Sequence, residues 1–519
     1  MRQTIARLFR TDLGVLILLA VVFVTLHVAT SRPYGFHRDE LATLDDARHL
    51  EWGFVAYPPL TPAMGRLGLS LFGISTVGAR LFPILALAVV VVLSGLLARE
   101  LGGSRKAQVL TALAVAIVPI VTIQTSVLQY VSFDYLWCVL LTYLLLRLLN
   151  SGDINSDALN ENDPRWWFAI GAVIGLGMMT KYTMAFFTAG LVGGLLLTGA
   201  FEKRIRRHLL SPWLWAGVAV SLLIFLPNLI WQIRHSFISL DFLRHIHARD
   251  VRWGRTRGFF PEQLFVCVNT LVVPLVFMGL VFYFTERGRK YRLLGWMFVL
   301  TFAMFALAQA RSFYPGPLYP MLLAAGSVVW ERWVTVRPRT PSLAIQGVTW
   351  LLVASGAVAS FALFTPVAPI NSGLWNATAK IHENFTEEIG WTDLVATVAR
   401  VYKSVPSSER VGTGILVGNY GEAGAINLYG PQYGLPPAIS KTNSAWYRSY
   451  PSTEPQRLIV LGLDDDYLKE HFEHCDLVAH NTNPYGVINE ESRDHPDIYL
   501  CHHLLQPWPE FWRDSLWFG

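Results

Sequence analysis

The residues best suited to chemistry lie near the start of the chain, between Arg32 and Leu71, in a segment that begins RPYGFHRDELATLDDARHLEWGFVAYPPL. This segment directly follows an apolar run and holds two histidines and five carboxylates, namely His37, His49, Asp39, Glu40, Asp45, Asp46 and Glu51. A carboxylate where lipid meets water can act as a general base toward a hydroxyl. Acids also suit the first turn of a helix, where the macrodipole favours negative charge. Spacing alone leaves both interpretations of Asp39 and Glu40 open.

Other ionisable residues stand at the ends of apolar runs. Asp134 begins one such run, and ionisable groups at membrane depth are usually functional, although a helix cap would also explain it. Lys181 lies between two apolar runs, where it could hold a phosphate as a point charge or extend to the interface. Arg311 precedes a Tyr-Pro-rich stretch that includes Tyr314, and a cation beside a phenol suits a phosphate or a sugar. The prolines alone would also fit a re-entrant joint.

The composition indicates what must position these groups. The chain has 519 residues, of which 53% are hydrophobic and 15% charged, and a mean hydropathy of +0.38, whereas a soluble protein carries about 25% charged residues. Residues up to 365 alternate apolar runs with short polar joints, and residues 366–519 resemble ordinary soluble sequence. We therefore predict a polytopic α-helical membrane domain over 1–365, with an external loop at 31–79, and a soluble α/β domain over 366–519.

A helix needs about 20 apolar residues to span a bilayer, and we expect about eleven spans: 13–30, 80–98, 108–125, 133–149, 166–180, 183–200, 212–230, 263–284, 293–309, 315–330 and 345–364. Basic residues in the joints at 99–106, 203–207, 287–292 and 332–339, together with Arg2, Arg7 and Arg10, mark the cytoplasmic side. The N-terminus is then cytoplasmic, and the loop at 31–79 and the C-terminal domain lie outside.

One external segment fits this rule poorly, since residues 231–263 carry Arg234, Arg244, Arg249, Arg252, Arg255 and Arg257. Either the predicted number of spans is wrong there, or these cations bind an anionic partner.

The loop and the C-terminal domain give local signals. Residues 39–51 should form a helix that Pro58 and Pro59 end, and a second helix should follow over 60–71. In the tail we expect helices at 393–403 and 464–474 and strands at 410–418, 457–463 and 476–480. Cys475 and Cys501 could form a disulfide if this domain is extracytoplasmic.

Two stretches resemble known motifs without matching them. Residues 418–425 (GNYGEAGA) resemble a phosphate-binding glycine loop but lack the full pattern and the later acid. Residues 464–466 (DDD) resemble an acidic metal-binding motif, but they fit the start of a helix better. The sequence has neither an HExxH nor a CxxC motif.

Taken together, these features resemble bacterial glycosyltransferase family 39, a group of GT-C enzymes related to the protein O-mannosyltransferases and the lipid A aminoarabinose transferase. The resemblance covers most of residues 10–330. It rests on a first span followed by Asp39-Glu40, a Trp-Gly pair at 52–53, the run Pro58-Pro59-Leu60, Asp134, the stretch ending Thr-Lys-Tyr at 180–182, and the element 311–320.

The resemblance implies a glycosyltransferase, either a hexosyl- or a pentosyltransferase, in the bacterial inner membrane. The enzyme would move a sugar, with inversion, from a polyprenyl-phosphate carrier to a hydroxyl of a lipid, glycan or protein acceptor outside the cytoplasm. Asp39 matches the family's catalytic aspartate, Glu40 its companion acid and Asp134 the acidic residue of its second loop. We then expect Asp45, Asp46 and Glu51 to form the solvated side of a helix that lies in the membrane interface. We expect the pKa of the catalytic carboxylate to be somewhat raised.

Lys181 and Arg311 are candidates to bind the carrier phosphate, and Tyr314 to bind phosphate or sugar. The sequence departs from the family at Tyr57, where some relatives have a basic residue. His37, Arg38 or an arginine of residues 231–263 would have to replace that contact.

The resemblance implies membrane lipids as surroundings and no nucleic-acid partner. It identifies no cofactor with certainty and leaves a divalent cation open. A transporter or flippase of a lipid-linked sugar is the alternative function. Transporters usually show repeated halves and midplane sites, whereas this sequence shows no repeat and its carboxylates cluster in a loop.

Overall fold

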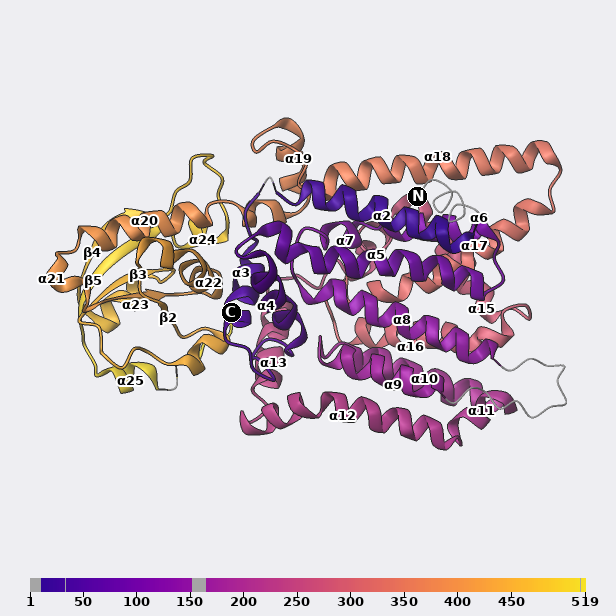
Figure 1. Ribbon diagram of the computed structural model, residues 1–519, viewed down its shortest axis with the longest axis horizontal. Coiled ribbons are helices and arrows are strands. Elements are labelled where there is room, and N and C mark those ends of the chain that lie inside the picture. The colour runs from indigo at the N-terminus through magenta and orange to yellow at the C-terminus, as the bar shows by residue number, and fades with distance from the viewer. Residues whose placement is uncertain (1–10, 33, 152–164, 514) are drawn as a thin grey trace.

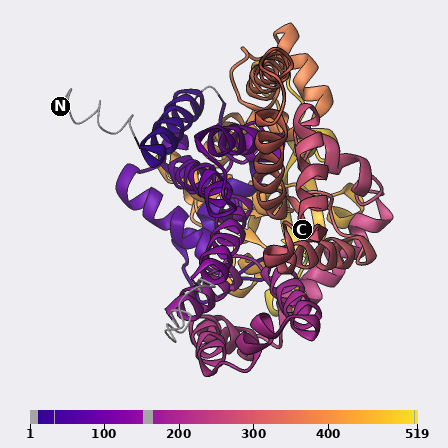
Figure 2. The same ribbon diagram turned by 90° about the vertical axis from the view of Figure 1, so that its right-hand side faces the viewer.

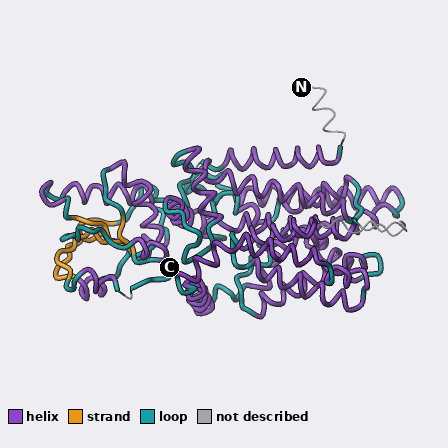
Figure 3. The backbone as a smooth tube through the Cα atoms, turned by 60° about the horizontal axis from the view of Figure 1, so that its bottom comes forward, coloured by secondary structure: helices purple, strands orange, loops and turns teal. Residues whose placement is uncertain are grey.

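The computed structural model describes residues 11–32, 34–151, 165–513 and 515–519. Long helices form a bundle at one end of the molecule, and a small sheet domain lies beyond the ends of those helices (Figure 1). All strands of the described residues lie in this second part (Figure 3). Arg2, Arg7 and Arg10, which helped to orient the sequence, lie outside the described residues.

The bundle contains the elements α2 (Asp12–Thr30), α5 (Thr76–Glu100), α6 (Arg105–Ala116), α7 (Pro119–Ile123), α8 (Tyr130–Asn150), α9 (Arg165–Met178), α10 (Met184–Phe201), α11 (Lys203–Leu209), α12 (Pro212–Arg234), α13 (Ile238–Arg252), α14 (Phe259–Phe265), η1 (Thr270–Val272), α15 (Val273–Phe284), η2 (Arg289–Tyr291), α16 (Arg292–Leu307), η3 (Gly316–Leu318), α17 (Tyr319–Thr335) and α18 (Arg339–Phe364).

In the described part of the chain, seven helices are long and apolar enough to cross a membrane, or eight if α14 and α15, bent by 84°, count as one span. The protein is therefore a multi-span membrane protein. Every segment that we expected to span contains a helix or a pair of helices, but length and hydropathy do not confirm the number eleven.

The helices divide into a buried centre and an apolar periphery. In the most apolar 18-residue stretch of each helix, 67% of the residues are buried in α5 and 72% in α8, but only 11% in α12 and 17% in α18. Because α12 and α18 are apolar on faces that no protein covers, those faces suit lipid. Figure 2 views this arrangement along the helices, with the sheet domain behind.

The loop between α2 and α5 forms two short helices, α3 (Arg38–Arg48) and α4 (Leu60–Phe72), as predicted. The α3 helix begins with a capping box, in which the His37 side chain accepts from the Asp39 N–H and the Glu40 carboxylate accepts from the His37 N–H. This reciprocal arrangement satisfies two helix-end donors. It fixes the direction of the first turn, and Asp39 lies within that turn.

The C-terminal part contains the helical elements α19 (Gly373–Ile381), η4 (Glu383–Glu388), α20 (Trp391–Ser404), α21 (Ser407–Arg410), α22 (Tyr420–Tyr429), η5 (Gly430–Tyr433), η6 (Asn443–Arg448), α23 (Asp465–His471), α24 (Glu490–Asp494) and α25 (Trp508–Trp512). Its strands are β1 (Thr413–Val417), β2 (Ala438–Ser440), β3 (Arg457–Leu461), β4 (Phe472–His480) and β5 (Asp497–Leu504).

These strands form one sheet in the order β2-β1-β3-β5-β4, with β2, β1 and β3 parallel and β5 antiparallel to both of its neighbours. Ile415 and Val417 face the helices α20 and α22, while Leu416 packs on the side of α25, as the period of two in a strand requires. Each expected helix and strand is present, but the helix expected at 464–474 ends at His471 and β4 begins at Phe472. The strands β2 and β5 and the remaining helices, α22 among them, were not predicted.

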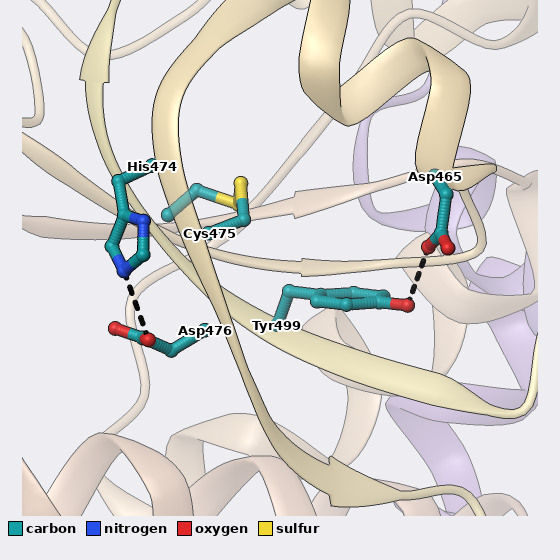
Figure 4. The surroundings of a disulfide bond; sticks show 6 residues. Asp465, His474, Cys475, Asp476 and Tyr499 are labelled. Atoms are coloured by element: carbon teal, nitrogen blue, oxygen red, sulfur yellow. Dashed lines mark hydrogen bonds and ion pairs between the residues drawn. A yellow bond between two sulfur atoms is a disulfide. The ribbon is translucent and has the colours of Figure 1, made fainter.

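Cys475 of β4 and Cys501 of β5 occupy paired positions in the sheet and form a disulfide with an S–S distance of 2.01 Å. Figure 4 shows its surroundings, where Asp465 accepts from the Tyr499 hydroxyl and His474 contacts Asp476. Cys138 and Cys267 are buried free thiols in the helical part.

Candidate active site

A cavity of about 610 Å³ lies where the helix ends of the bundle meet the sheet domain. The α3, α4, α13 and α22 helices meet in this region (Figure 1). Six of the nine predicted catalytic and substrate-binding residues line the cavity. Four of them are charged and two are phenols: Arg38, Asp39, Lys181, Arg311, Tyr57 and Tyr314. Groups from joints far apart in sequence therefore share one space.

Asp39 presents a carboxylate whose two oxygens are held from different parts of the chain. Its Oδ2 accepts from Gln129 Nε2 at 2.8 Å, and its Oδ1 accepts from the Tyr420 hydroxyl at 3.1 Å. Burial acts to raise the pKa of this carboxyl, but the fields of His37 and Arg38 and the hydrogen bond from Tyr420 outweigh it. The pKa of Asp39 consequently lies below its ordinary value. The expectation of a raised pKa was wrong.

Glu40 does not line the cavity. Its carboxylate is fully buried and pairs with Arg80, with Arg80 Nε 3.0 Å from Oε1 and Nη2 2.6 Å from Oε2. The same carboxylate accepts from the Leu128 N–H at 2.8 Å and caps α3. With its oxygens occupied in this way, Glu40 positions the loop, and the structure does not place it beside the reacting groups as a companion acid.

His37 also lies outside the cavity lining, because its ring caps α3. Burial lowers the pKa of His37, which favours a neutral imidazole at pH 7. Arg38 does line the cavity, but its Nη1 lies 2.5 Å from Glu490 and 3.3 Å from Glu491. Neither residue simply takes the place of the basic residue that relatives carry near Tyr57.

Tyr57 donates from its hydroxyl to Asp46 at 2.8 Å and faces the cavity. The expectation that Asp45, Asp46 and Glu51 form the solvated side of an interfacial helix was wrong for the two aspartates, which are 6% and 9% exposed. Both pair with Arg448 of the C-terminal domain. Docking of that domain removes this face of α3 from water.

Asp134 lies just behind the cavity wall. Its Oδ2 accepts from the Thr183 hydroxyl at 3.0 Å, and its Oδ1 has no hydrogen-bond partner among the described residues. The charge of Lys181 acts on it. Asp134 therefore does not line the cavity, and it acts on Lys181 through its charge rather than through a direct ion pair among the described residues.

Lys181 faces the cavity from the joint between α9 and α10. Its Nζ lies 3.6 Å from the ring centroid of Tyr130 and 4.0 Å from that of Tyr314. Burial lowers the pKa of Lys181, and the charge of Asp134 opposes that effect. Rings hold this ammonium mainly by cation–π attraction, which leaves its N–H donors suited to an anion.

Arg311 makes a bidentate pair with Asp250 of α13, at 2.6 Å and 2.9 Å. Arg249 and Arg255 also line the cavity and lie within 3.9 Å of the same carboxylate. Two of the six arginines that fitted the charge rule poorly therefore face the cavity. Of the explanations left open, this placement favours an anionic partner.

The sequence-based prediction missed Gln129, Tyr130, Asp250 and every contribution of the C-terminal domain, including Tyr420 and the segment 442–445. The pair Asn419 and Glu422 forms a capping box at the start of α22, so the glycine-rich stretch is a helix start. No signal in the sequence could show that this helix packs on α3.

Among residues 11–32, 34–151, 165–513 and 515–519, no group of three or more His, Cys, Asp or Glu side chains could hold a metal ion.

The fold can be compared with solved structures. ArnT from Cupriavidus metallidurans in the apo state matches with a TM-score of 0.59 at 15% identity. The same protein bound to undecaprenyl phosphate matches with a TM-score of 0.57 at 16% identity, and both matches cover 94% of this chain and 98% of that chain. The oligosaccharyltransferase AglB from Archaeoglobus fulgidus, in complex with an inhibitory peptide and a dolichol-phosphate, matches with a TM-score of 0.51 at 13% identity, over 80% of this chain and 63% of that one. The protein therefore shares the fold of these structures.

Sequence comparisons agree with the likeness to these structures. Residues 56–231 match the family model described as dolichyl-phosphate-mannose-protein mannosyltransferase. An undecaprenyl phosphate-alpha-4-amino-4-deoxy-L-arabinose arabinosyl transferase from Pseudomonas fluorescens is 27% identical over 294 residues, which are 54% of this chain and 51% of that protein. The match thus spans about half the length of this curated relative. The resemblance to the GT-C glycosyltransferase family inferred from sequence is confirmed.

Proposed function

We propose that this protein is a membrane glycosyltransferase that moves a sugar from a polyprenyl-phosphate carrier to a hydroxyl of an extracytoplasmic acceptor, with inversion. The observation that carries the proposal is the cavity itself, in which an ionised carboxylate, Asp39, faces the cations Lys181, Arg249, Arg255 and Arg311. The carboxylate suits a base, and the cations suit an anionic leaving group. The match to a structure bound to undecaprenyl phosphate supports the same donor class.

The reaction follows from these charges. The bond between the anomeric carbon and the phosphate oxygen breaks, and the electron pair leaves with the polyprenyl phosphate. Cations that line the cavity stabilise the growing charge on this oxygen. The acceptor oxygen attacks from the opposite face, and its proton passes to Asp39. A lowered pKa keeps Asp39 ionised at neutral pH, so it is ready to accept that proton.

Asp134 and Glu40 then act through other residues. The charge of Asp134 favours the ammonium form of Lys181, and Glu40 holds the first turn of α3 through Arg80. Tyr57 lies on the cavity wall where a basic residue is missing. We therefore propose that Arg249 and Arg255 supply the positive charge that relatives provide near that position.

For the arrangement in the membrane, we propose eleven spans in the inner membrane, with residues 1–365 as the catalytic domain and residues 366–519 as a periplasmic domain. The pairing of Cys475 with Cys501 supports an oxidising compartment for the second domain. A reporter enzyme that is active only outside the cytoplasm, fused after Gly519, should be active. An inactive but well-expressed fusion would refute this orientation.

The activity is tested with purified protein in detergent, a panel of undecaprenyl-phosphate pentoses and hexoses, and a membrane lipid extract as acceptor. Mass spectrometry would detect release of undecaprenyl phosphate together with the glycosylated product. Asp39→Asn should abolish transfer. Asp241→Asn, at an exposed carboxylate of α13, should not affect it. Transfer in detergent would also exclude a pure flippase, since no bilayer is present, and wild-type transfer by Asp39→Asn would refute the assignment of the base.

A further inference from the structure

The C-terminal domain contacts the loop at 31–79 through charged and polar side chains. Arg38 pairs with Glu490 and Glu491, and Arg448 pairs with the two aspartates of α3. The Ser444 hydroxyl accepts from the Val55 N–H at 3.0 Å. Contacts of this density between the two parts hold the domain at the mouth of the cavity in a fixed orientation.

The apolar core continues across the same boundary. Phe36, Leu41 and Leu44 of the loop pack in one buried cluster with Trp391 and Ile426 of the C-terminal domain. A cluster shared by two parts of a chain gains its hydrophobic stabilisation only when both are docked.

Helices α3 and α22 approach closely at Gly424. A Cβ atom at this position would lie 2.5 Å from the carbonyl carbon and oxygen of Leu41. Backbone atoms cannot move aside as a flexible side chain can, so only glycine permits this packing. The approach brings the first residue of α22, Tyr420, to Asp39.

The inference rests on the proposed function, in which Asp39 is the base. It concerns Tyr420, which with Gln129 donates a hydrogen bond to the Asp39 carboxylate. We infer that Tyr420 of the C-terminal domain is a positioning residue for Asp39. The C-terminal domain therefore forms part of the active site. The Tyr420 hydroxyl donates to Oδ1 at 3.1 Å, opposite the bond from Gln129 to Oδ2. With both oxygens held, the carboxylate cannot rotate away from the cavity, and it keeps its free lone pairs for the acceptor hydroxyl.

Other charged and titratable groups face the same carboxylate. They are His37 and Arg38 at the start of α3, Tyr57 before α4, Tyr130 of α8, Arg311 before η3 and Tyr420 of α22. The hydrogen bond from Tyr420 is one of the interactions that lower the pKa of Asp39. Its removal should therefore raise that pKa while the other groups remain.

The test is Tyr420→Phe, which removes one oxygen atom and leaves the ring. A hydrogen bond to a charged group is worth about 1.5–3 kcal/mol, so kcat should fall by about tenfold or more, with little change in the KM for the lipid-linked donor. The acid limb of the pH profile of kcat/KM should move to higher pH. A purely structural role would lower the amount of active protein without moving this limb.

The matched control is Tyr429→Phe in the same helix, because the Tyr429 hydroxyl makes no hydrogen bond among the described residues and does not line the cavity. It should retain wild-type kcat and pH profile. A second variant, Gly424→Val, should separate α22 from α3 and lower kcat even if the purified protein stays folded and binds donor.

The outcomes separate this inference from the proposed function. Full kcat and an unmoved acid limb in Tyr420→Phe, while Asp39→Asn is inactive, would overturn the role of Tyr420 and leave the glycosyltransferase intact. Absence of transfer by the wild-type protein with every donor would instead refute the function.

Discussion

Replacing Glu40 by Gln tests whether this buried acid is structural or catalytic. Its partner Arg80 is fully buried and would keep only one carboxylate partner, Glu388, at 3.2 Å. Burial raises the pKa of Glu388 to about 8, and the charge of Glu40 contributes to that rise. Since the substitution removes the charge of Glu40, Glu388 should ionise more readily in the variant and offset part of the loss. Loss of one member of a buried ion pair costs about 3–5 kcal/mol, a large part of a typical stability of about 5–15 kcal/mol.

The matched variant removes both charges, with Glu40→Gln and Arg80→Gln together. No charge then stays buried without a partner, and the amides can retain part of the hydrogen bonding, so we expect much of the lost stability to return. Thermal unfolding in detergent, followed by tryptophan fluorescence, measures both changes. Transfer activity should recover in the double variant along with stability.

Two results would refute this reasoning. One is wild-type unfolding of Glu40→Gln, which would mean that the pair with Arg80 contributes little. The other is a double variant that is stable but inactive, which would restore Glu40 to a catalytic role.

Three further outcomes are expected. Arg311→Lys replaces a bidentate pair with Asp250 by a point contact, and the KM for the donor should rise about tenfold in initial-rate measurements. Glu422 has a pKa raised to about 8 by burial, so the folded state keeps a proton that the unfolded state loses. Stability should fall as pH rises from about 4.5 to about 8, and melting temperatures of Glu422→Gln should show a smaller fall over this range. Replacing Cys475 and Cys501 by Ser opens a link across 26 residues and should lower the free energy of unfolding of the C-terminal domain by about 3 kcal/mol in denaturant titrations.

Local signals explain what the sequence predicted well. The acids at the start of α3 and the prolines before α4 act on their own backbone, so both short helices were predictable. Asp39, Lys181 and Arg311 each follow or precede an apolar run, which puts them at helix ends. Helix ends on one side of a membrane lie close together, and the cavity contains all three.

Packing between distant segments explains what was missed. Asp45 and Asp46 were expected in water because α3 is polar on that side, but Arg448 covers them from more than 400 positions away in the chain. Glu40 was treated as a partner of its neighbour Asp39, although successive residues on a helix point in different directions. Its side chain turns to Arg80, and no sequence spacing indicated that pair.

The geometry also ranks the candidate phosphate ligands, which the sequence could not do. Arg311 uses its Nε and Nη2 on Asp250, and Arg38 is paired with two glutamates, so binding an anion would draw each away from a carboxyl partner. Lys181 instead lies over the rings of Tyr130 and Tyr314. Cation–π attraction is weaker than contact with the anionic phosphodiester of the donor in a cavity of low dielectric. The donor phosphate should therefore bind first to Lys181, and Lys181→Met should weaken donor binding more than Arg311→Lys does.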